Sequence, residues 1–430
     1  MVDDQMSLAR GSVVEPPPLP EAFGKPLTPV GGGERNLTMD LLRGFALLGI
    51  LISNMIYFSQ PLEEMGMREE LWHNSLDKLS DWFSILLVEG KFYPLFSFLF
   101  GLGFSIQLGR AALRGKKIAA TFKRRLCILM FLGVCHGVFL WDGDVLFLYG
   151  ACGFALLLFR DRRPKTIVIW AAVLIALPAV VILFLGLMVL LMSANPQIAS
   201  EMRASMVQEP EVLYELTKAY VTGGYLDAIR YRLVNWLEIT FYTALFSPSF
   251  FGMFLVGLLA GRLGYFSDPD ANQSTLSRVF VLCCIAGLVI NFIAASATIF
   301  GVSRENYGVW LLAGGLLSIG GPVLCLAYIS GIVLLVNRIP KARIFEVVAS
   351  SGRMALTNYL LQSLIATTVF YGYGLGLGGQ FGRLETIFLA VFIFVAQVIT
   401  SYFWLQNFRF GPMEWLWRSA TYRELQPMRR

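Results

Sequence analysis

The sequence has 430 residues, of which 56% are hydrophobic and only 15% are charged. A soluble protein of this length would carry nearer a quarter charged residues, so the composition excludes an ordinary soluble globular protein and favours a lipid-facing exterior. The net charge is +6, but no basic and aromatic stripe of the kind that binds nucleic acid accompanies it. We therefore expect an all-α, polytopic membrane protein that lies in a lipid bilayer and has no nucleic-acid partner.

Residues 1–36 precede the first apolar segment and are rich in proline and glycine, including Gly31, Gly32 and Gly33. This composition is typical of a disordered tail. The acidic start and the late apolar run do not fit a signal peptide. We predict that 1–36 is a disordered cytoplasmic tail.

The rest of the chain contains segments with the roughly 20 apolar residues that a membrane-spanning helix needs. They lie at 38–58, 81–108, 121–141, 144–160, 166–192, 238–263, 276–300, 309–336, 354–373 and 384–406. The second is interrupted by Glu89-Gly90-Lys91 and by Pro94, which predicts a broken helix. The pattern predicts roughly ten transmembrane helices.

The loops between these segments alternate in charge. Segments 109–125, 160–165 and 337–353 and the C-terminal tail are basic, whereas 59–80 and the turn at 142–144 are acidic. Because basic loops stay in the cytoplasm, the alternation places both termini there and requires an even number of spans.

One segment on the opposite, outer side is long, at 193–237. Its apolar positions recur at helical spacing between charged residues, which indicates amphipathic helices on the outer membrane surface. A small lid over a cavity is the alternative.

The cysteine pattern gives no metal site. All six lie inside apolar runs without a CxxC pair near histidines: Cys127, Cys135, Cys152, Cys283, Cys284 and Cys325. We expect buried small side chains and no bound metal.

Two histidines are present, and both fall at or near the predicted outer face. His73 precedes the second span, and His136 lies near the end of the third, shortly before Asp144. An imidazole titrates near neutral pH, so either can act as a general base beside a carboxylate such as Asp144. The alternative is that each binds a backbone carbonyl or interfacial water.

Polar residues within the spans are costly in lipid and face a protein interior or a watery cavity. Asp40 and Arg43 share one face of the first span, where they can pair or anchor a ligand head group. Asn54 lies towards the outer end of that span and can donate to an oxyanion or to another helix. Glu89 lies at the predicted helix break.

A second polar group lies near the C-terminal end. Arg353 is a candidate for binding phosphates, as are the basic residues of 109–125. Asn358 and Gln362 are one turn apart in an apolar helix, so they share a face. They either join helices or line a binding face or pore.

Five stretches of the sequence form a combination of motifs: residues 40–50, 96–101, 136 with 143–146, 352–359 and 411–418. Together they resemble the bacterial YeiB-like family, whose C-terminal half is called domain of unknown function 418. The resemblance covers nearly the whole chain after residue 35. It implies a multi-pass protein of the bacterial inner membrane with two halves, 37–237 and 238–430.

The N-terminal half contains a second ordered set of residues: Asp40, Arg43, Gly44, Asn54, His73, Asp81, Pro94, Phe96 and Phe98. In this order they resemble the pattern of the transmembrane acyltransferases, including heparan-alpha-glucosaminide N-acetyltransferase. This resemblance implies His73 as catalytic base with Asn54 as its partner. It also implies acyl-CoA as donor, a small-molecule, lipid or glycan acceptor, and a homodimer.

Two functional hypotheses follow. The first is transfer of an acyl group from a cytoplasmic donor to an acceptor at the outer face. The second is a transporter or channel for a small solute, which rests on the polar residues within the spans. A membrane scaffold is a third reading, in which those polar residues are purely structural.

Overall fold

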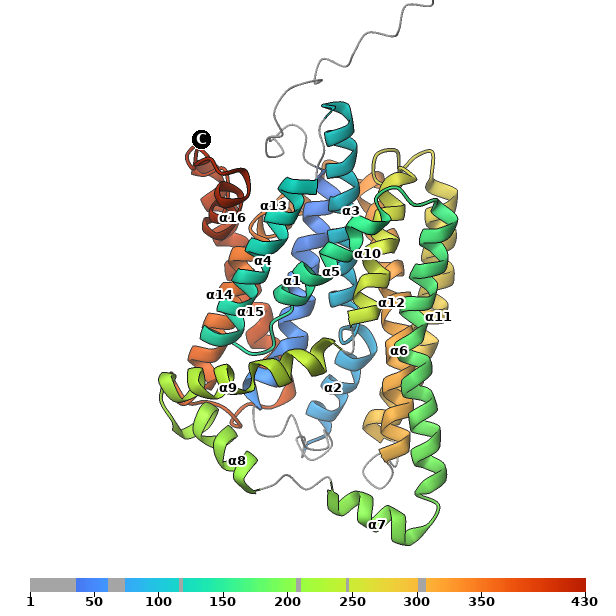
Figure 1. The fold of residues 1–430 in the computed structure, drawn as a ribbon, viewed down its shortest axis with the longest axis vertical. Coiled ribbons are helices and arrows are strands. Elements are labelled where there is room, and N and C mark those ends of the chain that lie inside the picture. The colour runs from blue at the N-terminus through green and yellow to red at the C-terminus, as the bar shows by residue number, and fades with distance from the viewer. Residues whose placement is uncertain (1–35, 61–73, 116–118, 206–209, 245–246, 301–306) are drawn as a thin grey trace, which may run out of the picture.

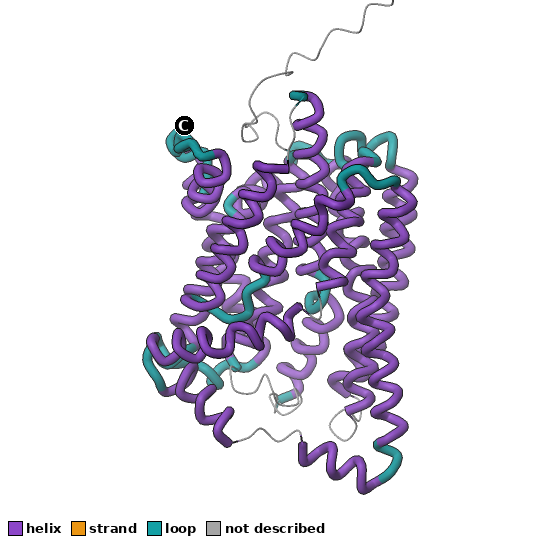
Figure 2. The backbone as a smooth tube through the Cα atoms, viewed as in Figure 1, coloured by secondary structure: helices purple, strands orange, loops and turns teal. Residues whose placement is uncertain are grey.

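The computed structural model describes residues 36–60, 74–115, 119–205, 210–244, 247–300 and 307–430. The predicted tail lies outside these ranges except for Asn36, which caps the first helix by accepting a hydrogen bond from the Met39 amide. Within the described ranges the regular elements are helices, apart from one isolated bridge between Phe408 and Arg429 (Figure 2). The predicted all-α class is confirmed.

The helices of the first half are α1 (Leu37–Ser59), α2 (Ser75–Leu87), α3 (Phe92–Leu113), α4 (Ala119–Phe139), α5 (Leu146–Leu156), α6 (Pro164–Met192), α7 (Pro196–Ser205), α8 (Pro210–Thr217) and α9 (Tyr225–Ala244). Those of the second half are α10 (Ser247–Arg262), α11 (Gln273–Phe300), α12 (Tyr307–Arg338), α13 (Arg343–Arg353), α14 (Ala355–Phe370), α15 (Arg383–Asn407) and α16 (Pro412–Tyr422). A short 3₁₀ turn (Leu157–Phe159) follows α5, and a π-helical turn (Lys218–Thr222) lies between α8 and α9.

Helix α1 packs against α3, α13, α14 and α15, while α6, α10, α11 and α12 form a second group beside it (Figure 1). Helices α3 and α10 meet without intervening side chains. A Cβ on Gly101 would clash with the Phe254 carbonyl, and one on Gly257 would clash with the Phe98 carbonyl. Glycine at both contact points lets the two backbones touch, as small residues do between membrane helices.

The outside of the second group is apolar. Exposed side chains on α6 include Val180 and Phe184, and those on α11 include Leu282 and Phe292. An apolar surface that extends over two long helices would cause aggregation in water, whereas the hydrocarbon of a bilayer solvates it. The protein is therefore a membrane protein.

Six spans of the described residues are long and apolar enough to cross a membrane: Leu37–Ser59, Ser75–Leu113, Pro164–Met192, Gln273–Phe300, Tyr307–Arg338 and Arg383–Asn407. They correspond to six of the ten predicted segments. The other four coincide with shorter or more charged helices, so the number ten and the sidedness of the termini remain predictions.

Two helix boundaries, between α2 and α3 and between α9 and α10, test the segments predicted from the sequence. The predicted break falls between α2 and α3, where Gly90 has a left-handed φ of 78° that other residues rarely adopt. Pro94 is instead accommodated in the first turn of α3. The predicted single segment 238–263 is wrong, because α9 ends at Ala244 and α10 begins at Ser247, with Pro248 in its first turn.

The segment at 193–237 is helical, as α7, α8, the π-helical turn and the first part of α9. These elements lie at the end of the molecule opposite α16 and the C-terminus (Figure 1). The end of α3, with Arg110 in its last turn, and α16 therefore lie far from this segment, which the sequence predicts to be external.

Candidate active site

A serine, a histidine and an aspartate are connected by hydrogen bonds where the last turn of α4 packs against α14. His136 Nδ1 lies 2.9 Å from Asp144 Oδ1, and His136 Nε2 lies 2.9 Å from Ser363 Oγ. His136 and Ser363 are each 2% exposed. Because a carboxylate only accepts, Nδ1 carries a proton, and in the neutral imidazole Nε2 accepts the serine hydroxyl. This is the arrangement that activates a serine nucleophile, and such triads are recognised by geometry rather than by sequence order.

Local structure fixes the aspartate. Asp144 Oδ2 accepts a hydrogen bond of 2.9 Å from the Phe147 amide, so the same carboxylate caps the first turn of α5 and holds the imidazole. On α4, a Cβ at Gly133 would lie 2.7 Å from that Oδ2. Glycine at 133 therefore makes room for Asp144 beside His136, one turn of helix away.

Tyr359 lies next to the histidine. The two rings are 5.0 Å apart, and the buried Tyr359 hydroxyl lies by the Val145 backbone N–H, with no acceptor for its own O–H within the described part of the chain. Tyr359 and Ser363 are one turn apart on α14, so both project from the same face. A buried donor without a partner is uncommon and is a candidate for contact with a ligand.

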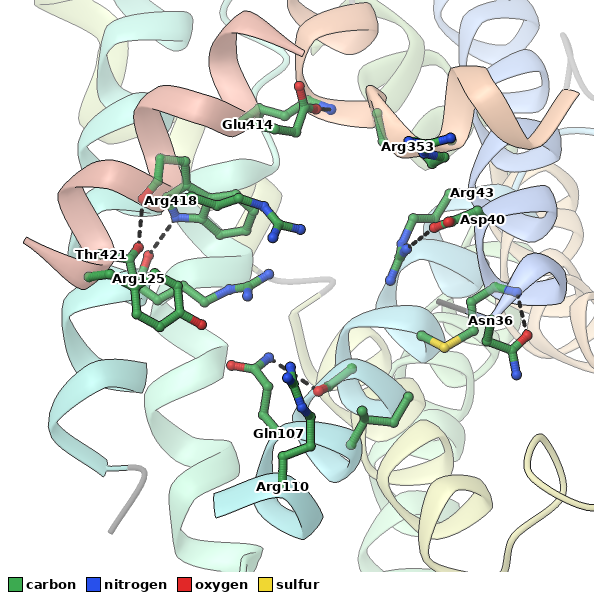
Figure 3. Close-up of a pocket in the computed structure, with 18 residues that line it drawn as sticks. Asn36, Asp40, Arg43, Gln107, Arg110, Arg125, Arg353, Glu414, Arg418 and Thr421 are labelled. Atoms are coloured by element: carbon green, nitrogen blue, oxygen red, sulfur yellow. Dashed lines mark hydrogen bonds and ion pairs between the residues drawn. The ribbon is translucent and has the colours of Figure 1, made fainter. Parts of the chain in front are cut away.

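A basic cavity of about 250 Å³ opens at the α16 end of the bundle (Figure 3). We call it the vestibule. Five half-buried arginines and two carboxylates line it: Arg43, Arg110, Arg125, Arg353, Arg418, Asp40 and Glu414. Arg43 Nη1 lies 2.5 Å from Asp40 Oδ1. In Figure 3, Arg125 and Arg418 reach into the cavity from the side opposite Arg43. Among the described lining residues the arginines outnumber the carboxylates, and several guanidinium groups around one cavity favour an anionic ligand.

Glu414 is bound by the first turn of α14. Its Oε1 accepts from the Leu356 and Thr357 amides at 2.6 and 3.1 Å, and its Oε2 accepts from the Thr357 hydroxyl at 2.6 Å. The carboxyl therefore caps α14 and fastens α16 to it. Burial raises the pKa of the Glu414 carboxyl, and the hydrogen bonds from Thr357 and Leu356 oppose that rise.

A second cavity of about 180 Å³, here called the channel, adjoins the vestibule. Both are lined by Arg43, Gly103, Gln107, Arg125, Ala355, Leu356 and Trp417. Beyond these the channel is lined mainly by apolar side chains, including Phe96, Leu129 and Leu146, and it ends at Val145 and Tyr359. The two cavities thus connect the arginines with the residues that adjoin the triad.

Helical spacing connects the two cavities to the triad. On α4, Arg125, Leu129 and His136 lie on one stripe, and on α14 Leu356, Tyr359 and Ser363 do the same. On α1, Arg43 and Ile50 line the cavities, and Asn54 lies one turn further along that face. Asn54 is half-buried, and it is not a lining residue of either cavity.

Glu89 belongs to a different cluster, between α2 and α15. Arg383 is fully buried and its Nε lies 3.1 Å from Asp81 Oδ1, while Nη2 lies 3.5 Å from Glu89 Oε1 and also donates to Ser84 Oγ. The predicted binding residue Glu89 is therefore part of a buried ion network and is absent from the lining of the vestibule and channel. The sequence analysis did not identify Arg383.

Asn358 and Gln362 join α14 to α15. Asn358 Nδ2 donates to Ser401 Oγ at 3.0 Å, and Gln362 Nε2 donates to Gln397 Oε1 at 2.9 Å. Gln397 Nε2 in turn donates to the Asn358 carbonyl at 3.0 Å. These contacts fit the predicted role in joining helices, on a face of α14 different from that of Ser363.

Of the predicted site residues, His136 and Asp144 meet in space, and Asp40, Arg43 and Arg353 line the vestibule. His73 lies outside the described residues. Sequence reasoning missed Ser363, Tyr359 and Arg418 as site residues, although the basic 109–125 segment did supply Arg110 and Arg125. In the described ranges, no group of three His, Cys, Asp or Glu side chains is placed to hold a metal ion.

Comparison with known proteins places the chain in a family. The family model DUF418, described as a protein of unknown function, matches residues 260–424. YxaH of Bacillus subtilis, described as an uncharacterized protein, is 32% identical over 94% of this chain and 98% of its own length. YeiB of Escherichia coli, with the same description, is 31% identical over 92% of this chain and 98% of its own length. An uncharacterized 39.9 kDa protein of Bacillus acidopullulyticus is 31% identical over 94% and 98%. Because the similarity extends over nearly the full length of both partners, the chain belongs to the YeiB-like DUF418 family.

Proposed function

We propose that this protein is a membrane acyltransferase in which His136, oriented by Asp144, serves the reaction of an acyl-CoA in the vestibule and channel. The observation that carries the proposal is the continuity of three parts. An arginine-lined mouth continues into an apolar channel, and the channel ends at Tyr359 beside the His136–Asp144–Ser363 triad.

The vestibule fits the phosphates of the donor. Guanidinium groups bind phosphate oxygens through paired, charge-assisted hydrogen bonds. The helical rise places His136 about 16 Å beyond Arg125 along α4. That separation suits an extended pantetheine arm, with the nucleotide phosphates among the arginines and the thioester near the imidazole.

The triad supplies the chemistry in two steps. His136 Nε2 takes the Ser363 hydroxyl proton while Ser363 Oγ attacks the thioester carbonyl. The carbon–sulfur bond breaks, and the CoA thiolate takes the proton from the imidazolium, which leaves an acyl ester on Ser363. The acceptor hydroxyl or amine then attacks this ester and gives its proton to His136, which returns it to Ser363. The Tyr359 hydroxyl is available to stabilise the oxyanion in both steps.

The sidedness of the reaction rests on the basic loops. With the vestibule end in the cytoplasm, as the positive-inside rule predicts, the donor enters from the cytoplasm and the acceptor arrives from the other face. The similar proteins named above come from bacteria, which supports the proposed location in the bacterial inner membrane. A homodimer remains an expectation of the acyltransferase resemblance.

His73 and Asn54 are the alternative base and partner implied by the same resemblance. Asn54 lies on the face of α1 that lines the channel, which supports a place near the substrate. His136 has the described carboxylate and serine partners, so we assign it the main role and keep His73 as the residue to compare.

The transporter hypothesis has weaker support. Asp40, Glu89, Asn358 and Gln362 all have polar partners within the protein, as expected of groups that hold helices together. None of these contacts requires a passing solute.

The test is thioester cleavage by purified full-length protein in nanodiscs, with acetyl-CoA and longer acyl-CoA donors. Wild type and His73→Gln should bind donor, read as a thermal shift, and cleave the thioester. His136→Gln should keep donor binding and lose cleavage by about 10²–10⁴-fold, the usual contribution of a general base. No donor binding by folded wild type, or full cleavage by His136→Gln, would contradict the proposal. If Ser363→Ala keeps cleavage while His136→Gln loses it, His136 acts directly on the acceptor.

A further inference from the structure

Arg232 of α9 is buried without a hydrogen-bond partner among the described residues. Its side chain is 0% exposed, and within the described part of the chain none of its three guanidinium nitrogens has a hydrogen-bond partner. The guanidinium carbon lies 5.4 Å from the Tyr220 ring centre and 5.7 Å from that of Tyr371. The tyrosine rings stabilise the cation through their π faces, but they leave its N–H donors unused.

Burial of the Arg232 guanidinium without hydrogen-bond partners is unfavourable in free energy. Moving a cation out of water costs several kcal/mol unless partners satisfy its charge and its donors. The nearby carboxylate is Asp142, whose Oδ2 accepts the Tyr220 hydroxyl. Burial, and next Asp142, raise the pKa of that hydroxyl well above its usual range, so Tyr220 remains protonated and engaged with Asp142. Arg232 is therefore a ready receptor for a second anion.

Arg232, Tyr220, Tyr371 and Asp142 form a cluster, which we call the Arg232 cluster. It lies beside the triad on the side away from the vestibule. Asp142 is in the same turn as Asp144, and the Trp141 ring lies 6.5 Å from that of His136. Trp141 also packs in one core cluster with Tyr220 and Tyr371. The π-helical turn holds Tyr220 in place, since the Gly372 amide donates to the Tyr220 carbonyl at 3.0 Å. Insertions of this kind are frequent at functional sites.

We propose that Arg232 binds a small oxyanion, a carboxylate or phosphate monoester, at the outer end of the site. That this oxyanion is carried by the acyl acceptor rests on the function proposed above. Guanidinium forms two parallel hydrogen bonds with either group. The segment from α8 to α9 would then act as an acceptor-binding cover over the triad. The oxyanion can come from a water-soluble acceptor or from a lipid head group.

The test measures stabilisation by anions in full-length protein held in phosphatidylcholine nanodiscs. Inorganic phosphate and acetate are the soluble probes, and nanodiscs containing phosphatidic acid provide the lipid arm. Wild type should unfold at a higher temperature with at least one probe. Arg232→Met should lose this shift, whereas the control Arg230→Met, exposed on the same helix, should keep it. Vestibule binding cancels, because the variants share the same vestibule.

Two further variants allow for a failure of Arg232→Met to fold. Asp142→Asn removes the competing carboxylate and should tighten binding of the effective probe by about tenfold. Arg232→Lys keeps the charge but loses the paired geometry and should weaken it by about tenfold. Equal shifts in wild type and Arg232→Met, or in wild type, Arg232→Lys and Asp142→Asn, would overturn the proposal. An absence of any anion effect in wild type, with Asp142→Asn destabilising on its own, would show instead that Arg232 is only a structural partner of Asp142.

A donor assay separates this proposal from the previous one. Arg232→Met should still bind acyl-CoA and slowly hydrolyse it with water as acceptor. If anion binding depends on Arg232 while no variant binds acyl-CoA, the anion site stands and the acyltransferase proposal fails. If Arg232→Met loses donor binding together with anion binding, the cluster is not a separate acceptor site.

Discussion

Two buried basic regions of this protein differ in how their charge is balanced. Arg383 lies fully buried between Asp81 and Glu89, with Ser84 occupying a further donor. Among its described lining residues the vestibule instead has five half-buried arginines and two carboxylates, and one of these carboxylates, Glu414, is occupied as a helix cap. A fully buried, paired cation holds helices together, whereas several partly exposed arginines around one cavity are suited to a ligand. An arginine within a span is therefore assigned a structural or a ligand-binding role from its ion pairs and its exposure, and not from its presence alone.

The largest effect should come from breaking the compensated region. Arg383→Met removes the buried cation that pairs with Asp81 and Glu89 and should destabilise the fold by about 3–5 kcal/mol. Thermal unfolding and expression yield in detergent measure this. The exposed Lys341→Met is the matched control. A well-folded Arg383→Met protein with an unchanged unfolding temperature would contradict the structural role of Arg383.

Removing a cation from the vestibule should change stability little and weaken donor binding strongly. Arg43→Gln breaks only a partly exposed pair with Asp40, so stability should change by less than about 1 kcal/mol. Acyl-CoA affinity should fall by about tenfold to a hundredfold, the value of a charge-assisted hydrogen bond. Isothermal titration with wild type and Lys123→Gln, an exposed neighbour on α4, provides the reference. Unchanged affinity would exclude Arg43 from donor binding.

Ionic strength should separate the two regions without mutation. Donor binding at the open vestibule should weaken steadily between about 50 mM and 500 mM salt, because mobile ions screen exposed charges. The unfolding temperature should change little, since the Arg383 network is out of reach of solvent. Donor affinity that is independent of salt would contradict electrostatic recognition of phosphate.

The smallest effect concerns the channel. Leu129 lies between Arg125 and His136 on α4 and lines the apolar cavity. Leu129→Phe should narrow it and shift donor preference toward shorter acyl chains, with little loss of acetyl-CoA turnover. Ile128→Phe, adjacent on the helix but not a lining residue, should leave the preference unchanged. An unaltered chain-length profile in Leu129→Phe would mean that the acyl chain lies elsewhere.

The sequence predicts the long elements well. The predicted spans 38–58 and 166–192 nearly coincide with α1 and α6, because long apolar runs admit few other structures in a membrane. The junction between α9 and α10 was missed, since a short interruption inside an apolar run barely changes its mean hydropathy.

Only part of the candidate active site could be predicted from the sequence. His136 and Asp144 are close in the chain, so their pairing could be anticipated. Ser363 joins them from α14, and nothing in its apolar surroundings indicates which helix face it shares with Tyr359. The opposite error affects Glu89, whose partner Arg383 is far away in sequence. Tertiary pairing, which a single sequence does not encode locally, decides both cases.

The most direct measurement is an experimental structure of the full-length protein in nanodiscs with a non-hydrolysable thioether analogue of an acyl-CoA. Our account predicts the phosphates among the vestibule arginines, the acyl chain in the channel beside Leu129, and the thioether sulfur close to His136 and Ser363. A saturated complex in which the analogue lies outside the vestibule and channel, or in which its sulfur is remote from His136, would contradict it.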